Sequence, residues 1–71
     1  MKTAVDYTKE IVSVAELYNA EVHAEGNQYV IKYQKLGEGS LISSLIEDRL
    51  GFAENLRIKM IPSDQILIVE V

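Results

Sequence analysis

The sequence predicts an α+β domain, a two-layer sandwich with two helices on one face of a four-stranded, mainly antiparallel sheet. Two observations predict it. Apolar residues recur at helical spacing in two stretches. Two other stretches alternate apolar and polar residues on either side of a turn signal, at Gly26-Asn27 and at residues 62–65. The elements follow one another as α-β-β-α-β-β, and we expect residues 1–71 to form a single domain.

The first helix is expected to begin after Thr3. Asp6 follows Thr3 by three residues, which resembles a capping box with aspartate in place of the usual glutamate. Asn19 suits the C-terminal end of this helix. The apolar face is predicted to contain Ala4, Thr8, Ile11, Val12, Ala15 and Tyr18.

The stretch AEVHAEGNQYVIKYQ is expected to form the first hairpin, because Gly-Asn is a two-residue turn signal. Folding at this turn pairs His23 with Val30 and sets Glu21 opposite Lys32 as an opposite-charge pair. One face of the hairpin then carries Val22, Ala24, Tyr29, Ile31 and Tyr33, and both tyrosines are predicted core residues. The other face carries Glu21, His23, Glu25, Val30, Lys32 and Gln34.

The stretch SLISSLIEDRLGF predicts the second helix. Ser40 is the expected N-cap and Gly51 the C-terminal stop. Phe52 is expected to fold back on the last turn. The apolar stripe consists of Leu41, Ile42, Leu45, Ile46, Arg49 and Leu50.

The stretch ENLRIKMIPSDQILIVEV predicts the second hairpin. Its turn pairs Ile61 with Ile66, and Arg57 with Glu70 as a cross-strand ion pair. One face is predicted to carry Leu56, Ile58, Met60, Leu67, Val69 and Val71. The other is predicted to carry Arg57, Lys59, Ile61, Ile66, Ile68 and Glu70.

The last strand, ILIVEV, is the most apolar, which favours a central place in the sheet. With the strands numbered along the chain, this favours the order 3-4-2-1. The architecture then resembles a ferredoxin-like sandwich whose first strand has moved to the C-terminus. The order 1-2-3-4, with strands 2 and 3 as parallel neighbours, is the alternative.

Composition narrows the function classes. The chain lacks cysteine, carries a net charge of −4 and has no apolar run near the ~18 residues of a membrane helix. Its N-terminus lacks the apolar centre of a signal peptide. We therefore expect a cytoplasmic protein without membrane attachment, and the acidic balance disfavours broad binding to nucleic acid.

Three chemical motifs are interpreted as structural. The segment KLGEGS (residues 35–40) lies between strand and helix like a phosphate loop, but Glu38 opposes an anion and no lysine follows the second glycine. Glu21, His23 and Glu25 share a strand face and converge poorly on a metal. The serines at 40, 43 and 44 lack a base within reach, since the only histidine is expected on the opposite face. We expect no enzyme activity, metal or cofactor.

The sheet face away from the helices is the predicted site. Apolar residues there are rimmed by charges, as in a protein interface. We expect this face to bind a second copy of the chain or another protein. Nucleic-acid binding through Lys32, Arg57 and Lys59 is one alternative, and a small ligand at an oligomer interface is another. The predicted interface residues are Val30, Ile61, Ile66, Ile68, Lys59 and Arg57.

Overall fold

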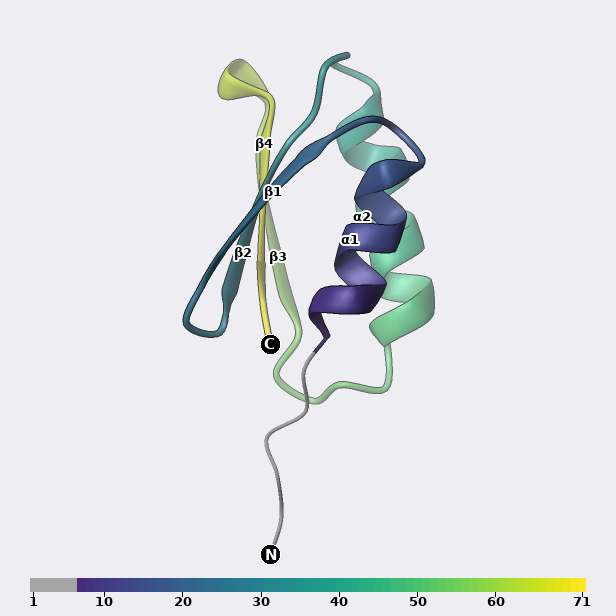
Figure 1. Cartoon of the computed structure of the whole chain (residues 1–71), viewed down its shortest axis with the longest axis vertical. Helices are drawn as coiled ribbons and strands as arrows, with labels where there is room; N and C mark the ends of the chain where they lie inside the picture. The colour runs from purple at the N-terminus through teal and green to yellow at the C-terminus, as the bar shows by residue number, and fades with distance from the viewer. Residues whose placement is uncertain (1–6) are drawn as a thin grey trace, which may run out of the picture.

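The computed structural model describes residues 7–71. Over these residues the chain forms α1 (Thr8–Glu16), β1 (Glu21–Glu25), β2 (Gln28–Lys32), α2 (Glu38–Leu50), β3 (Arg57–Ile61), the 3-10 helix η1 (Pro62–Asp64) and β4 (Ile66–Glu70). Both α-helices lie on the same side of the sheet, so the molecule has two layers and one sheet face is left uncovered by helices (Figure 1). The prediction of an α+β fold is confirmed. In the described part of the chain, no helix is long and apolar enough to cross a membrane.

The sheet has the order β1-β2-β4-β3, and every neighbouring pair of strands is antiparallel. Counted from β3, this order is 3-4-2-1. The C-terminal strand β4 therefore lies inside the sheet, between β2 and β3, and the alternating side chains Leu67 and Val69 are fully buried beneath the helices. The two edges of the sheet are β1 and β3.

Both hairpin registers are confirmed residue by residue. Glu21 lies opposite Lys32 and His23 opposite Val30 in the first hairpin. Gly26 has a φ of +59°, which suits the first position of a tight hairpin turn that only glycine occupies without strain. In the second hairpin, Gln65 takes the left-handed conformation at the end of η1, and the pairing runs from Ile61–Ile66 to Arg57–Glu70.

One apolar core lies between the layers. Tyr29 and Tyr33 are both buried in it, as predicted, with 5% and 2% of their surfaces exposed. In α1 the buried face differs in part from the prediction, because Val14 is fully buried while Val12 is partly exposed. Among residues 7–71, the buried core residues are Ile11, Val14, Ala15, Tyr29, Ile31, Tyr33, Ile42, Ile46, Leu50, Leu67 and Val69.

The helix ends follow the prediction only in part. Thr3, Ala4 and Asp6 lie outside the described residues, and within those residues α1 begins at Thr8 without a side-chain cap. At its other end Asn19 has a φ of 55°, and the amide of Ala20 donates to the carbonyl of Ala15, which is a Schellman ending. The left-handed conformation of Asn19 and the hydrogen bond that follows it thus agree with its predicted role at the C-terminal end of α1.

The prediction of Ser40 as the N-cap of α2 is wrong. The helix begins at Glu38, with Gly37 at the N-cap position, so Ser40 lies within the first turn. Gly51 does follow the last helical residue, as expected. Phe52 remains mostly exposed, and its ring centroid lies 5.9 Å from that of Tyr7.

Candidate interaction surface on the open sheet face

The uncovered face of the sheet, here called the outer face, consists of three straight rows of side chains that cross all four strands. Every second residue of each strand is on this face, and the registers align one such residue from each strand in every row. Read from β1 to β3, the rows are Glu21-Lys32-Ile66-Ile61, His23-Val30-Ile68-Lys59 and Glu25-Gln28-Glu70-Arg57. All six predicted interface residues therefore lie on one face, in neighbouring positions.

The middle of the outer face is apolar. Val30 and Ile68 are directly opposite each other on β2 and β4, and Ile66 and Ile61 adjoin them on β4 and β3. All four are partly exposed in the isolated chain. Because neighbouring strands are ~4.8 Å apart, these four side chains form one continuous apolar patch.

The charged residues of the outer face are divided between the two edges. Glu21 and Glu25 stand on β1, whereas Arg57 and Lys59 stand on β3, and all four are exposed. The face is thus acidic along one edge and basic along the other. The β2 and β4 strands add Lys32 and Glu70 at opposite ends of the apolar centre.

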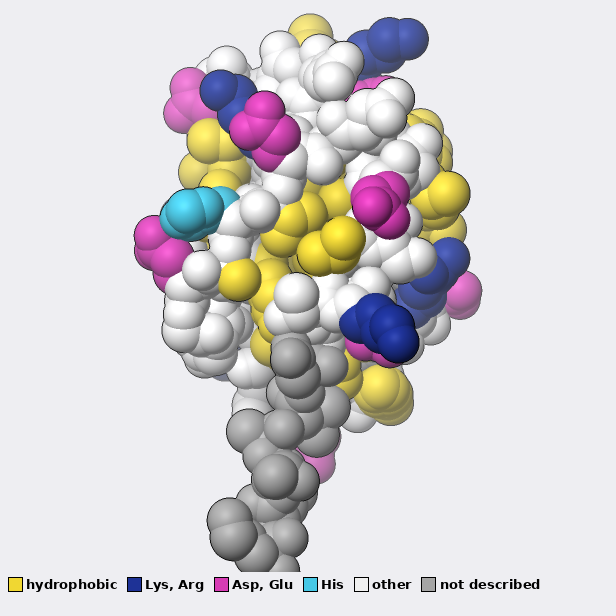
Figure 2. Space-filling model, in the orientation of Figure 1, with side chains coloured by type: hydrophobic (Ala, Val, Ile, Leu, Met, Phe, Trp, Pro, Cys, Tyr) yellow, Lys and Arg dark blue, Asp and Glu magenta, His cyan; other side chains and the backbone are white. Residues whose placement is uncertain are grey.

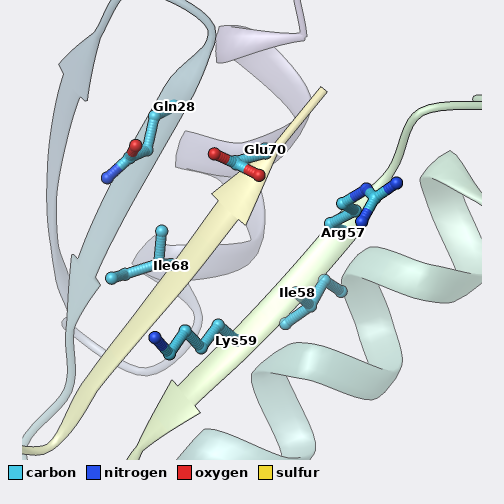
Figure 3. A pocket seen from close by; sticks show the side chains of 6 residues that line it. All are labelled: Gln28, Arg57, Ile58, Lys59, Ile68 and Glu70. Atoms are coloured by element: carbon cyan, nitrogen blue, oxygen red, sulfur yellow. The ribbon is translucent and has the colours of Figure 1, made fainter.

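The predicted cross-strand ion pairs do not form. Glu21 and Lys32 are opposite each other, as are Arg57 and Glu70, yet neither pair comes within ion-pair distance. In Figure 3 the Arg57 side chain extends away from the Glu70 carboxylate. Exposed charges gain little from pairing in water, because the attraction is weak and holding two long side chains costs entropy. Among the described residues these four side chains form no ion pair, so they can pair with charged groups on a partner.

Two shallow grooves hollow the outer face. One, of about 420 Å³, crosses β2, β4 and β3 and is lined by Gln28, Arg57, Ile58, Lys59, Ile68 and Glu70 (Figure 3). The other, of about 210 Å³, lies over β1 and β2 beside Val30 and Ile66. The sequence pattern did not indicate Gln28 as part of this face because it adjoins the turn. Its register position opposite Glu25 was the signal that could have placed it on this face.

The three cations considered for nucleic-acid binding are not gathered in one place. Lys32 stands on β2 in the row of Ile66, whereas Arg57 and Lys59 stand on β3, and Glu70 lies between Arg57 and β2. Among the described residues, the outer face carries no aromatic side chain on which a base could stack. The three cations and Glu70 thus form a mixed rim around an apolar centre.

The acidic edge brings two metal-ligating groups together. His23 Nε2 lies 3.5 Å from Glu25 Oε2, and both side chains are largely exposed. Figure 2 shows the single histidine of the chain at the surface beside acidic side chains. Within residues 7–71, no group of three histidine, cysteine, aspartate or glutamate side chains is arranged to hold a metal ion.

The KLGEGS segment turns the chain from β2 into α2. Glu38 Oε1 accepts hydrogen bonds from the backbone amides of Gln34 and Lys35, at 3.3 Å and 3.1 Å. The carboxylate thus places a negative charge at the start of the loop, which disfavours an anion there. The three serines of α2 belong to the helical layer, whereas His23 lies on the outer face, so the sheet separates them.

No protein-family model, curated protein or solved structure matches this chain.

Proposed function

We propose that this protein is a small, non-enzymatic interaction module that binds a second copy of itself through the outer face. The observation that carries the proposal is the arrangement of that face. Its apolar centre of Val30, Ile61, Ile66 and Ile68 lies between an acidic and a basic edge. Two copies of such a face are complementary to each other when one is turned so that unlike edges meet.

The charges favour one orientation of the second copy. A two-fold axis parallel to the strands places β1 of one copy over β3 of the other. Glu25 then faces Arg57 of the second copy, and Val30 faces Ile68 of the second copy at the centre of the interface. The same contacts occur twice, as a two-fold interface requires.

A two-fold axis that lies in the plane of the interface but perpendicular to the strands is disfavoured. It would place Glu21 of one copy over Glu25 of the other and Lys59 over its own counterpart. Like charges that face each other across an interface cost free energy. The charge pattern therefore supports the axis parallel to the strands, with the ~30° rotation usual for packed sheets.

The size of the outer face limits how much surface the dimer can bury. Four strands of five residues cover roughly 19 by 17 Å, from strand spacings of ~4.8 Å and rises of ~3.4 Å. That area is well below the ~800 Å² per partner of a standard stable interface. The proposal therefore implies a weak dimer that forms and dissociates with protein concentration.

We also propose that the architecture is a circular permutation of the ferredoxin-like sandwich. The support is the position of β4, which pairs with β2 and β3 as the first strand of such a sandwich does. A variant that opens the β3–β4 turn and places β4 at the N-terminus should then fold with an unchanged circular dichroism spectrum. A variant that does not fold would contradict this. The proposed architecture concerns the fold and carries no function by itself.

Sedimentation equilibrium over a range of concentrations tests the interaction. We expect Ile68→Lys to remove association through the outer face and so lower the average mass at each concentration, because a charge at the centre of an interface must be desolvated without a partner. Ser44→Lys adds the same charge to the exposed surface of α2 and should change nothing. A wild-type chain that is monomeric at every concentration would refute the proposal. Binding to RNA with a steep salt dependence would instead favour the nucleic-acid alternative.

A further inference from the structure

Within the described part of the chain, the two edge strands have unpaired backbone groups, and the strand registers determine their positions. The amide of Tyr33 donates to Gln65 and that of Val71 donates to Asn27, so the helix-facing residues of β2 and β4 bond to each other. Hydrogen bonding alternates along antiparallel strands. Leu67 and Val69 bond to β2, so their register partners on β3, Met60 and Ile58, have no ladder bond to β4. Ile58 and Met60 therefore direct their N–H and C=O groups away from the sheet.

The same alternation determines the groups on the β1 edge. Tyr29 and Ile31 bond toward β4, so their register partners Ala24 and Val22 have no ladder partner on β2. Ala24 and Val22 therefore direct their N–H and C=O groups outward. Both edges thus offer free backbone groups from residues whose side chains are on the helix side of the sheet.

The edges also remain open at the level of side chains. Ala24 on β1 and Met60 on β3 occupy helix-side positions, yet Ala24 is exposed and Met60 keeps 37% of its surface exposed. The two helices therefore do not extend over the edge strands at these positions. An added strand would find apolar surface there as well as free backbone groups.

We propose that β1 of one copy adds to the β3 edge of the next and continues the sheet from molecule to molecule. The direction of the strands permits it. Since all neighbours in the order β1-β2-β4-β3 are antiparallel, β3 and β1 run in opposite directions, and β1 of a following copy extends the same pattern. This contact uses the edges of the sheet and does not depend on the outer face.

The free backbone groups determine the register of this contact. Ala24 of the added strand lies opposite Ile58, and Val22 lies opposite Met60, so that each pair exchanges both of its free hydrogen bonds. The outward residues then follow. Glu25 meets Arg57 directly, His23 lies opposite Lys59, and Glu21 and Glu25 are the diagonal neighbours of Lys59.

Pairing of like edges is disfavoured in the equivalent registers. Two β1 edges would set Glu21 against Glu25, and two β3 edges would set Lys59 against its own counterpart, both of which are like-charge pairs. Edge charges usually protect a sheet from association. Here the charges on the two edges are of opposite sign, so they disfavour both homotypic pairings and favour the mixed one.

The contact is heterologous, since it joins two different surfaces. Such contacts form rings when the rotation closes and open-ended chains when it does not. Each added copy leaves a free β3 edge at one end and a free β1 edge at the other. Edge pairing therefore predicts trimers and larger species beyond the dimer expected from the outer face.

Cysteine cross-linking tests the proposal, because the natural chain has no cysteine. The variants Ala24→Cys and Ile58→Cys are mixed and oxidised. Their Cα atoms would be ~5.5 Å apart across the contact, within the range of a disulfide. Both positions are on the helix side of the sheet, so two outer faces in contact could not bring them together. Val22→Cys with Met60→Cys is a second pair in register.

We expect a disulfide-linked dimer from each mixture in register and a ladder of oligomers from the double variant Ala24→Cys/Ile58→Cys. Each single variant alone should remain monomeric on a non-reducing gel. Val22→Cys with Ile58→Cys is displaced by two residues and should cross-link far less. If neither pair in register forms a dimer, or all pairs cross-link equally, the proposal is wrong and the edge charges serve only to prevent association.

Discussion

A Cβ atom on Gly39 would lie 2.6 Å from the hydroxyl oxygen of Tyr33 and 2.7 Å from its Cζ. Tyr33 follows the last residue of β2 and is buried, so its ring has little room to move. Gly39 is in the first turn of α2. The contact thus places the start of this helix directly against the sheet, and it explains why the KLGEGS segment has its second glycine.

We expect Gly39→Ala to destabilise the protein. Alanine is the better helix former, which alone would raise the free energy of unfolding by up to about 1 kcal/mol. The clash with Tyr33 outweighs this, since overpacking a core costs about 1–3 kcal/mol. Thermal and urea unfolding followed by circular dichroism measure the difference.

Gly37→Ala is the matched control for this prediction. A Cβ on Gly37 would meet no atom within 4 Å, and the φ of −74° suits any residue. We expect an unchanged melting temperature or a small gain. If both glycines respond alike, the close approach of Tyr33 does not determine the response.

The two core tyrosines should respond differently to loss of the hydroxyl. The Tyr33 hydroxyl is buried, and within the described residues it has no hydrogen-bond partner, so Tyr33→Phe should leave the free energy of unfolding unchanged or raise it by about 1 kcal/mol. The Tyr29 hydroxyl lies 2.9 Å from Thr8 Oγ1, and Tyr29→Phe should lower it by about 1 kcal/mol. Urea unfolding of both variants measures these changes. A marked drop in the free energy of unfolding for Tyr33→Phe would contradict the absence of a hydrogen-bond partner for the Tyr33 hydroxyl among the described residues.

The KLGEGS segment should bind no phosphate. The Glu38 carboxylate already accepts hydrogen bonds from the backbone amides of Gln34 and Lys35, and its negative charge would repel an anion. In an NMR titration with inorganic phosphate, the amide signals of Gly37 and Gly39 should not move. Saturable shifts of these two signals would show an anion site that the carboxylate does not block.

The strand pairing could be predicted from the sequence because two local signals agreed. The turn at Gly26-Asn27 selects one register, and the same register places Tyr29 and Ile31 on one face. The second hairpin shows the same agreement between its turn and the alternation of Leu67 and Val69 with Ile66 and Ile68. A shift by one residue would bury charges, so few alternatives remained.

Other features depend on contacts between residues distant in sequence. The start of α2 is set by Glu38 reaching back to the chain before it and by Gly39 meeting Tyr33, so the preference of Ser40 for a cap did not decide it. Arg57 and Glu70 lie opposite each other in the register, yet they form no ion pair, because hydration of the exposed charges outweighs their attraction. The candidate site was predictable as a face, whereas the division of its charges between β1 and β3 also depends on the strand order, for which the sequence left 1-2-3-4 as an alternative.

A dilution series followed by methyl NMR tests the central claim, that the outer face binds a second copy. Strand β4 carries its own control, since Ile66 and Ile68 are on the outer face while Leu67 and Val69 are buried beneath the helices. We predict that the methyl signals of Ile66, Ile68 and Val30 move with protein concentration and that those of Leu67 and Val69 do not. Signals of the outer face that stay constant over the whole series would contradict the account.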